Sequence, residues 1–332
     1  MTSSVVRVAS AQYAADKLET MVDFRQKLER WVAEAAGTGA KLLVFPEFFG
    51  MEIASIADQR KAPDRRSPDR HTAGPLKVTP VCRREKPSLA WETEAVQTLM
   101  PDFIAVCSEL AAKYSVFMLS GSMPVRRTNS ELRNRAYFFS ANGGMGFQDK
   151  MVPVRWEREV WGITPGDRVN VFDTDFGPIG VTICYDTEFP LIARLQAEAG
   201  TRIILVPCCA DSARGFHRVR VGARARALEN QAYVMHSPFV GEASWSQILT
   251  TGVGTAGIYA PPDLGPDVNG VVAQAKNDKP QWVYADLDLG ALDRLRRGDG
   301  MIANKEEWDT HLAFGEVTKV AYESLSQHNA FA

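Results

Sequence analysis

The chain has 332 residues, of which 45% are hydrophobic and 23% charged, so it is long enough to bury a large core. Its formal net charge of −2 gives no electrostatic reason to expect nucleic acid or an anionic membrane as a partner, which favours a small molecule. No stretch has the roughly 18 uninterrupted apolar residues of a membrane helix, and the N-terminus does not resemble a signal peptide.

The cysteines number five, an odd count with irregular spacing that does not resemble a secreted disulfide framework. They are Cys82, Cys107, Cys184, Cys208 and Cys209. Neither a CxxC pair nor a histidine cluster with metal-ligand spacing is present in the sequence. We therefore expect a soluble, cytoplasmic protein of a reducing compartment, without a metal or an organic cofactor.

The first elements are a strand, a helix and a second strand. Residues 5–12 are rich in β-branched side chains, and apolar residues then recur at helical spacing over residues 24–35. Residues 41–45 read as a buried strand that Pro46 stops. Glu47 therefore follows the end of a strand, where α/β proteins often place their chemistry.

The next segment, residues 58–88, is rich in Arg, Pro, Asp and Lys and shows no period, so we expect a surface excursion there. Residues 91–114 have helical character. Pro101 is well placed to begin a second helix after a break within that segment.

The rest of the chain alternates between strands and helices, which predicts an α/β class with helices covering sheets. We expect one domain over residues 1–332, with a C-terminal extension from about residue 288. The predicted strands are residues 116–121, 135–140, 169–173, 179–184, 203–206, 233–237 and 282–286. The predicted helices are residues 190–198 and 217–229 and a short basic helix ending at Arg297.

Cys184 lies at the end of the apolar strand Gly180-Val181-Thr182-Ile183, just before Phe189-Pro190 begins a helix. A cysteine at such a turn is held rigidly, and the backbone N–H groups after it face a developing oxyanion. A nearby helix N-terminus also favours the thiolate. The same position equally suits a small buried core residue, which is the commoner role of a cysteine.

Glu47 and Lys150 are the other candidates for chemistry. A carboxylate directly after a buried strand is able to accept a thiol proton if burial raises its pKa towards neutrality. The ammonium of Lys150, after a glycine turn, suits an oxyanion. Singly, each is more commonly a solvated loop residue.

Together, the segments around these three residues resemble the motifs of the nitrilase superfamily of carbon–nitrogen hydrolases. Phe45-Pro46-Glu47 matches its glutamate motif, Asp149-Lys150 its lysine motif and Ile183-Cys184-Tyr185-Asp186 its cysteine motif. Arg224-Ala225-Arg226-Ala227-Leu228-Glu229-Asn230 is similar to its Arg-Ala-x-Glu-Asn helix, and the resemblance runs from about residue 5 to residue 288.

The resemblance implies a four-layer α-β-β-α sandwich, association into homodimers or larger homo-oligomers, and amide hydrolysis through a thioester on Cys184. It implies Glu47 as acid and base, Lys150 and the backbone N–H of Tyr185 as oxyanion donors, and no cofactor. The expected partner is a small amide or carbamoyl compound.

A second glutamate is also implied, and two stand close together. The spacing back from Pro165 favours Glu159, whereas the Trp161-Gly162 pattern of one bacterial branch favours Glu157. We expect Glu157 to take this role.

Three alternatives remain open from the sequence. Tyr185-Asp186 is typical of amide and carbamoyl hydrolases, and true nitrilases typically carry Trp-Glu there, so a nitrilase converting a nitrile to the acid is the second hypothesis. A non-catalytic binding module of the same fold is the third. A thiol-redox protein using the neighbouring Cys208 and Cys209 is the fourth.

Overall fold

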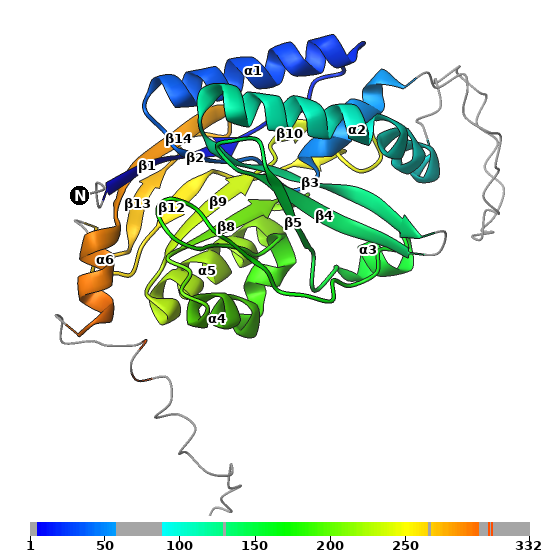
Figure 1. Cartoon of the computed structure of the whole chain (residues 1–332). Helices are drawn as coiled ribbons and strands as arrows, with labels where there is room; N and C mark the ends of the chain where they lie inside the picture. Colours follow the sequence, from blue (N-terminus) through cyan, green and yellow to red (C-terminus); the bar gives the residue numbers. More distant parts are fainter. Residues whose placement is uncertain are drawn as a thin grey trace, which may run out of the picture.

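The computed structural model describes residues 5–57, 88–128, 131–264 and 267–298, together with residues 305 and 307. Two six-stranded sheets face each other, with helices on the outer face of each (Figure 1). The predicted α-β-β-α sandwich is therefore confirmed. Of the surface excursion predicted at residues 58–88, all but Ser88 lies outside the described residues.

The first sheet places parallel strands in its middle and antiparallel strands at its edges. Its order is β14 (Gln281–Asp288), β1 (Val5–Gln12), β2 (Leu42–Val44), β3 (Phe117–Thr128), β4 (Glu131–Phe139) and β5 (Met145–Asp149). The turn Asn142-Gly143-Gly144 joins β4 to β5.

The second sheet is built around the parallel strands β7, β8 and β9. Its order is β13 (Val271–Gln274), β12 (Gly257–Tyr259), β9 (Tyr233–Pro238), β8 (Ile203–Cys208), β7 (Ile179–Val181) and β6 (Val171–Phe172). A separate two-stranded ribbon joins β10 (Gly241–Glu242) to β11 (Thr251–Gly252).

The helices form the two outer layers (Figure 1). The first sheet is covered by α1 (Met21–Gly37) and α2 (Leu89–Tyr114), and the second by α4 (Pro190–Glu198) and α5 (Ala213–Asn230). The short elements are η1 (Phe49–Ile56), α3 (Arg155–Glu159), η3 (Cys184–Glu188) and α6 (Leu289–Arg296).

The break predicted at Pro101 is wrong, because α2 is a single helix with Pro101 inside it. A proline removes one backbone hydrogen bond and crowds the preceding turn. On either side of it, the side chains of Val96 and Phe103 are fully buried in the core cluster between the helices and the first sheet. This packing keeps the helix continuous across the proline.

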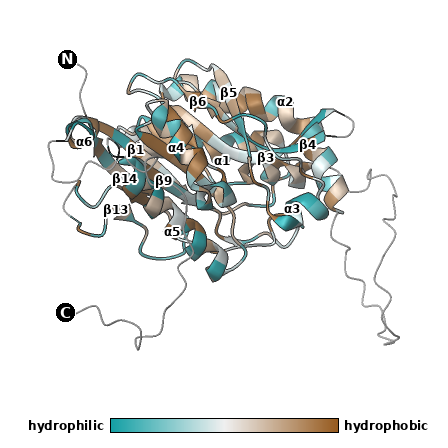
Figure 2. Cartoon of the chain, turned by 90° about the horizontal axis from the view of Figure 1, so that it is seen from below, coloured by the Kyte–Doolittle hydropathy of each residue, from teal (hydrophilic) through white to brown (hydrophobic). Residues whose placement is uncertain are grey.

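The core follows the two-residue alternation of the first sheet. Val6 and Val8 of β1 point between the sheets, whereas Ala9 and Ala11 point towards α1 and α2. Figure 2 shows hydrophobic segments running through the middle of the molecule, whereas α3 has hydrophilic colouring. In the described part of the chain, no helix is both long and apolar enough to cross a membrane.

Two predicted strands are shorter than expected. The strand predicted at residues 169–173 is only β6, and the one predicted at residues 179–184 ends at Val181. The chain turns there because Cys184 has a positive φ of 50°, which a strand does not accommodate, and η3 begins at this residue.

Gly121 lies at an irregularity of β3 against the loop that carries Glu47. Its φ is +65°, and an added Cβ would meet the backbone oxygen of Pro46 at 1.9 Å. This close approach fixes the start of the loop relative to β3. Gly37, by contrast, would place an added Cβ within 4 Å of no atom of the described chain.

We predict that Gly121→Ala destabilises the protein by about 3 kcal/mol, because backbone strain and overlap with Pro46 act together. Urea unfolding measures the free energy. Gly37→Ala is the matched control and should raise stability by about 0.5–1 kcal/mol, since alanine is the better helix former. Equal stability of Gly121→Ala and the wild type would contradict the prediction.

Candidate active site

Glu47 lies just beyond β2 with its side chain almost fully buried. Its Oε1 accepts hydrogen bonds from Lys150 Nζ at 2.8 Å and from Asn134 Nδ2 at 3.0 Å. Its Oε2 accepts from the backbone N–H of Cys209 at 3.1 Å. Groups from both sheets therefore hold the carboxylate in one orientation.

Lys150 follows β5 and is equally buried. Its Nζ lies 2.8 Å from Glu47 Oε1 and 2.6 Å from Glu157 Oε2, so one ammonium is shared by two carboxylates. Asn134 of β4 binds the same two carboxylates from another side, with Nδ2 at 2.8 Å from Glu157 Oε1. These four side chains form what we call the charge cluster.

The structure brings Glu157 and not Glu159 to Lys150. Glu157 is 2% exposed and also accepts the backbone N–H of Val154 at 2.7 Å, at the start of α3. Glu159, two residues later on the same short helix, is exposed and pairs with Arg155 at 2.8 Å. Glu157 is therefore part of the buried charge cluster, whereas Glu159 is on the solvent-exposed side of the helix.

Cys184 begins η3 at the end of the β7 segment, and its side chain reaches the charge cluster. Cys184, Glu47 and Lys150 line the same cavity, so the sulfur, the carboxylate and the ammonium lie close together. The sulfur also lies 3.7 Å from Cys208 Sγ and 4.0 Å from the backbone oxygen of Cys209. The positive φ of Cys184 aims its side chain into the cavity rather than along the strand.

The pKa values of Glu47 and Lys150 are set by burial and by the presence of two carboxylates beside one ammonium. Burial raises the pKa of Glu47, and the nearby Glu157 raises it further against the opposing effect of Lys150. Burial acts against the charge of Lys150, but Glu157 and Glu47 outweigh it and raise the pKa of Lys150 well above its usual value. The lysine therefore stays an ammonium, while Glu47 is set closer to neutrality than a solvated glutamate.

Asp186 joins the two segments that carry Lys150 and Cys184. Its Oδ1 accepts the N–H of Val152 at 2.7 Å, and its Oδ2 accepts those of Met151 at 3.2 Å and Ile183 at 3.1 Å. Burial raises the pKa of Asp186 to about 7. One side chain thus sets the distance between the lysine loop and the cysteine turn.

The cluster opens into a cavity of about 360 Å³, a size that suits a small molecule. Four aromatic side chains line it, namely Phe48, Trp156, Trp161 and Tyr185. Besides the charge cluster, four more charged side chains line it, namely Glu188, Asp211, Arg214 and Arg218. Arg218 pairs with Glu188 at 3.0 Å and lies over the ring of Tyr185, so the wall beside Cys184 is charged and aromatic.

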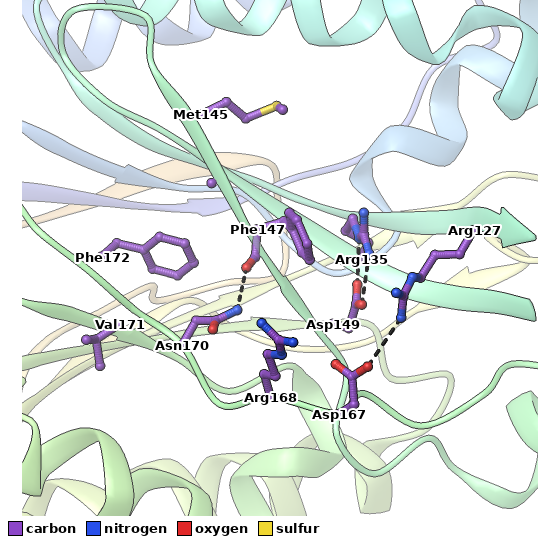
Figure 3. A pocket seen from close by; sticks show the side chains of 11 residues that line it. Arg127, Arg135, Met145, Phe147, Asp149, Asp167, Arg168, Asn170, Val171 and Phe172 are labelled. Atoms are coloured by element: carbon purple, nitrogen blue, oxygen red, sulfur yellow. Dashed lines mark hydrogen bonds and ion pairs between the residues drawn. The ribbon is translucent and has the colours of Figure 1, made fainter.

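A second cavity, of about 620 Å³, lies beside β5 (Figure 3). Arg135 lies over the Phe147 ring at 3.6 Å and pairs with Asp149, while Arg127 pairs with Asp167. No cysteine, serine, threonine or lysine is among its lining residues, and both of its aspartates are paired with arginines. Despite its size, this cavity is therefore not the candidate active site.

Two parts of the site were missed in the sequence. Asn134 gives no local signal, since it is a single asparagine between two arginines, just before the strand predicted at residues 135–140. The N–H of Cys209 is a backbone group, which no residue pattern identifies. Among the described residues, no group of His, Cys, Asp and Glu side chains is arranged to hold a metal ion.

Comparison with known proteins agrees with this geometry. A profile of the carbon–nitrogen hydrolase family matches residues 7–297. The probable hydrolase YhcX of Bacillus subtilis is 32% identical over 292 residues, which are 88% of this chain and 52% of that protein. The chain thus spans about half the length of YhcX.

Two solved structures share the fold. The carbon–nitrogen hydrolase of Helicobacter pylori G27 aligns with a TM-score of 0.66 at 20% identity, over 94% of this chain and 99% of that one. A mutant amidase from Nesterenkonia sp. AN1, with the acetamide moiety of fluoroacetamide added covalently at its active-site cysteine, aligns at 0.59 and 17%, over 88% and 94%.

The chain belongs to the carbon–nitrogen hydrolase family. The predicted membership of the nitrilase superfamily is confirmed by the family match and by the relatives.

Proposed function

We propose that the protein is a hydrolase that cleaves a non-peptide carbon–nitrogen bond, in an amide or carbamoyl group of a small molecule, through a thioester on Cys184. The observation that carries the proposal is that Cys184, Glu47 and Lys150 line one cavity, with Lys150 hydrogen-bonded to Glu47. The family match and the covalent adduct on the cysteine of the related amidase support it.

In the first half of the reaction, Glu47 takes the proton of the Cys184 thiol and the sulfur attacks the amide carbon. The ammonium of Lys150 and the backbone N–H of Tyr185 stabilise the oxyanion, at about 3 kcal/mol for a well-placed donor. The intermediate collapses with rupture of the C–N bond. Glu47 returns its proton to the leaving nitrogen, and ammonia or an amine departs.

In the second half, water enters and loses a proton to Glu47 as it attacks the thioester carbon. The sulfur leaves, takes the proton from Glu47 and regenerates the thiol. Glu157 shares the ammonium with Glu47 and so keeps Lys150 charged and in place. Asp186 and Asn134 position these groups without touching the substrate.

The residues after the nucleophile, Tyr185 and Asp186, favour an amide or carbamoyl group over a nitrile. We also propose that the protein is cytoplasmic. We propose that the chain forms a single domain.

We also propose that the chain forms homodimers or larger homo-oligomers through the outer faces of α4 and α5. Leu191 of α4 and Val221 of α5 are each 66% exposed, which is unusual for apolar side chains on adjacent helices of a monomer. A second copy of the same face would cover them.

We predict that the double variant Leu191→Asp, Val221→Asp lowers the molar mass measured by light scattering to that of one chain. Charges on a covered apolar face oppose its burial. Val22→Asp, at a side chain 59% exposed on α1 in the opposite outer layer, is the control and should keep the wild-type mass. A monomeric wild type would contradict the oligomer.

We predict that Cys184→Ala lowers ammonia release by at least about 1000-fold, because the nucleophile is removed. The assay is a panel of short amides, carbamoyl compounds and the matching nitriles. Cys107→Ala, on the buried face of α2 and not among the residues that line the cavity, is the control and should retain activity. Turnover that survives Cys184→Ala contradicts the mechanism, and hydrolysis of nitriles alone supports the nitrilase alternative.

We predict that Glu157→Gln moves the acid limb of the kcat/KM profile to lower pH. The negative charge of Glu157 raises the pKa of Glu47, so without it Glu47 stays deprotonated, and able to act as base, at lower pH. Glu159→Gln, on the exposed side of the same helix, is the matched control and should leave the limb unchanged. An unshifted limb in Glu157→Gln would show that Glu47 is not the group that titrates there.

A further inference from the structure

A second sulfur lies beside the proposed nucleophile. Cys184 Sγ and Cys208 Sγ are 3.7 Å apart, and both side chains are buried, at 8% and 0% exposure. The reaction proposed above gives Cys208 no role. A cysteine in van der Waals contact with a nucleophilic cysteine is able to form a disulfide with it, which an alanine or a serine at the same position is not.

The strand register brings these sulfurs together. β7 and β8 are parallel neighbours in which Val181 pairs with Leu205, and Cys184 and Cys208 are each the third residue beyond that pair. Neighbouring strands lie about 4.8 Å apart. Disulfides bridge Cα atoms about 4.4–6.8 Å apart, with an S–S bond of about 2.05 Å. The sulfurs therefore have to approach by about 1.7 Å, which side-chain rotation can supply.

We propose that Cys208 is a resolving cysteine, which closes a reversible disulfide with Cys184 after a peroxide has oxidised Cys184. This inference rests on the proposed function only in giving Cys184 the role of nucleophile. The disulfide removes the free thiol and so switches the hydrolase off. A dithiol reductant restores it.

The reaction balances with one hydrogen peroxide. The Cys184 thiolate attacks one peroxide oxygen, the O–O bond breaks, and the departing hydroxide takes up the proton lost by the thiol, giving a sulfenic acid and water. The Cys208 sulfur then attacks the Cys184 sulfur and the S–O bond breaks. The hydroxyl group leaves as water with the Cys208 proton. Two thiols lose two electrons, and the peroxide is reduced to two waters.

The position of Cys208 suits the second step, because its sulfur already lies 3.7 Å from that of Cys184. The hydrogen bond with Cys184 and burial raise the pKa of Cys208 well above its usual value. This thiol therefore does not compete for the peroxide, and it keeps the proton that the departing hydroxyl group takes up in the second step. Cys184 lines the cavity through which a small peroxide enters. With Cys208 next to it, a sulfenic acid on Cys184 is captured before further oxidation to the irreversible sulfinic acid.

The other described cysteines are placed differently. Cys209 presents its backbone oxygen to Cys184, at 4.0 Å, and its N–H to Glu47. Cys107 packs in α2, within the other core cluster. Replacing Cys209 therefore gives a matched control beside Cys208.

The test uses the full chain, hydrogen peroxide as oxidant and dithiothreitol as reductant. In the wild type, peroxide should lower the intact mass by about 2 Da and link tryptic peptides 169–194 and 203–214. Labelling of Cys184 by fluoroacetamide should fall with the disulfide and return after reduction. Cys209→Ser should behave like the wild type, which assigns the link to Cys208.

In Cys208→Ala the mass should instead rise by about 32 Da, and labelling recovered by reduction should fall about tenfold relative to the untreated variant. Cys208→Ser replaces it if the alanine variant does not fold. A mass gain without a disulfide in the wild type, a link within peptide 203–214 alone, or equal recovery in both proteins would overturn the proposal. The mass readout needs no substrate, so a disulfide in a protein that hydrolyses nothing would separate this inference from the proposed function.

Discussion

The sharing of one buried ammonium by two buried carboxylates is the interaction on which the site depends. Glu47, Lys150 and Glu157 are each no more than 2% exposed. Isolated charges so far from water are strongly unfavourable, so each must be paired and hydrogen-bonded. Asn134 and the backbone N–H groups of Cys209 and Val154 complete the set. Since two carboxylates face one ammonium, the cluster lacks one positive charge, and this deficit favours a proton on Glu47.

The sandwich fold supplies these partners because both sheets end at the same rim. Glu47 follows β2, Lys150 follows β5, and Cys209 follows β8 of the opposite sheet. Gly121 lets β3 approach the Glu47 loop closely, and Asp186 bonds the Lys150 loop to the turn of Cys184. The positions of the reactive groups are thus set by sheet packing and by a few short polar contacts, and less by the flexibility of loops.

Periodicity and motifs predicted much of this molecule, and contacts between distant segments account for the rest. The helix at 190–198 and the strand at 5–12 were predicted with their observed bounds, because their patterns are local. Glu157 and Glu159 share one short helix, so only the placement of α3 against Lys150 separates them. Asn134 lies 87 residues from Glu47 in the chain, and such a pairing leaves no local trace.

Burial of the charge cluster costs free energy on folding, and in the proposed reaction the same burial lets Glu47 exchange protons. The same carboxylate must accept a proton from the thiol, deliver it to the leaving nitrogen and accept another from water. A solvated glutamate has a pKa near 4.3 and is almost fully deprotonated at neutral pH, so it rarely holds a proton that it can give to the leaving nitrogen. Burial and Glu157 raise the pKa of Glu47, which brings its two protonation states closer in free energy, and Lys150 keeps the rise from going too far. Desolvation is therefore part of the chemistry, and the fold that imposes it sets how readily the proton moves in each direction.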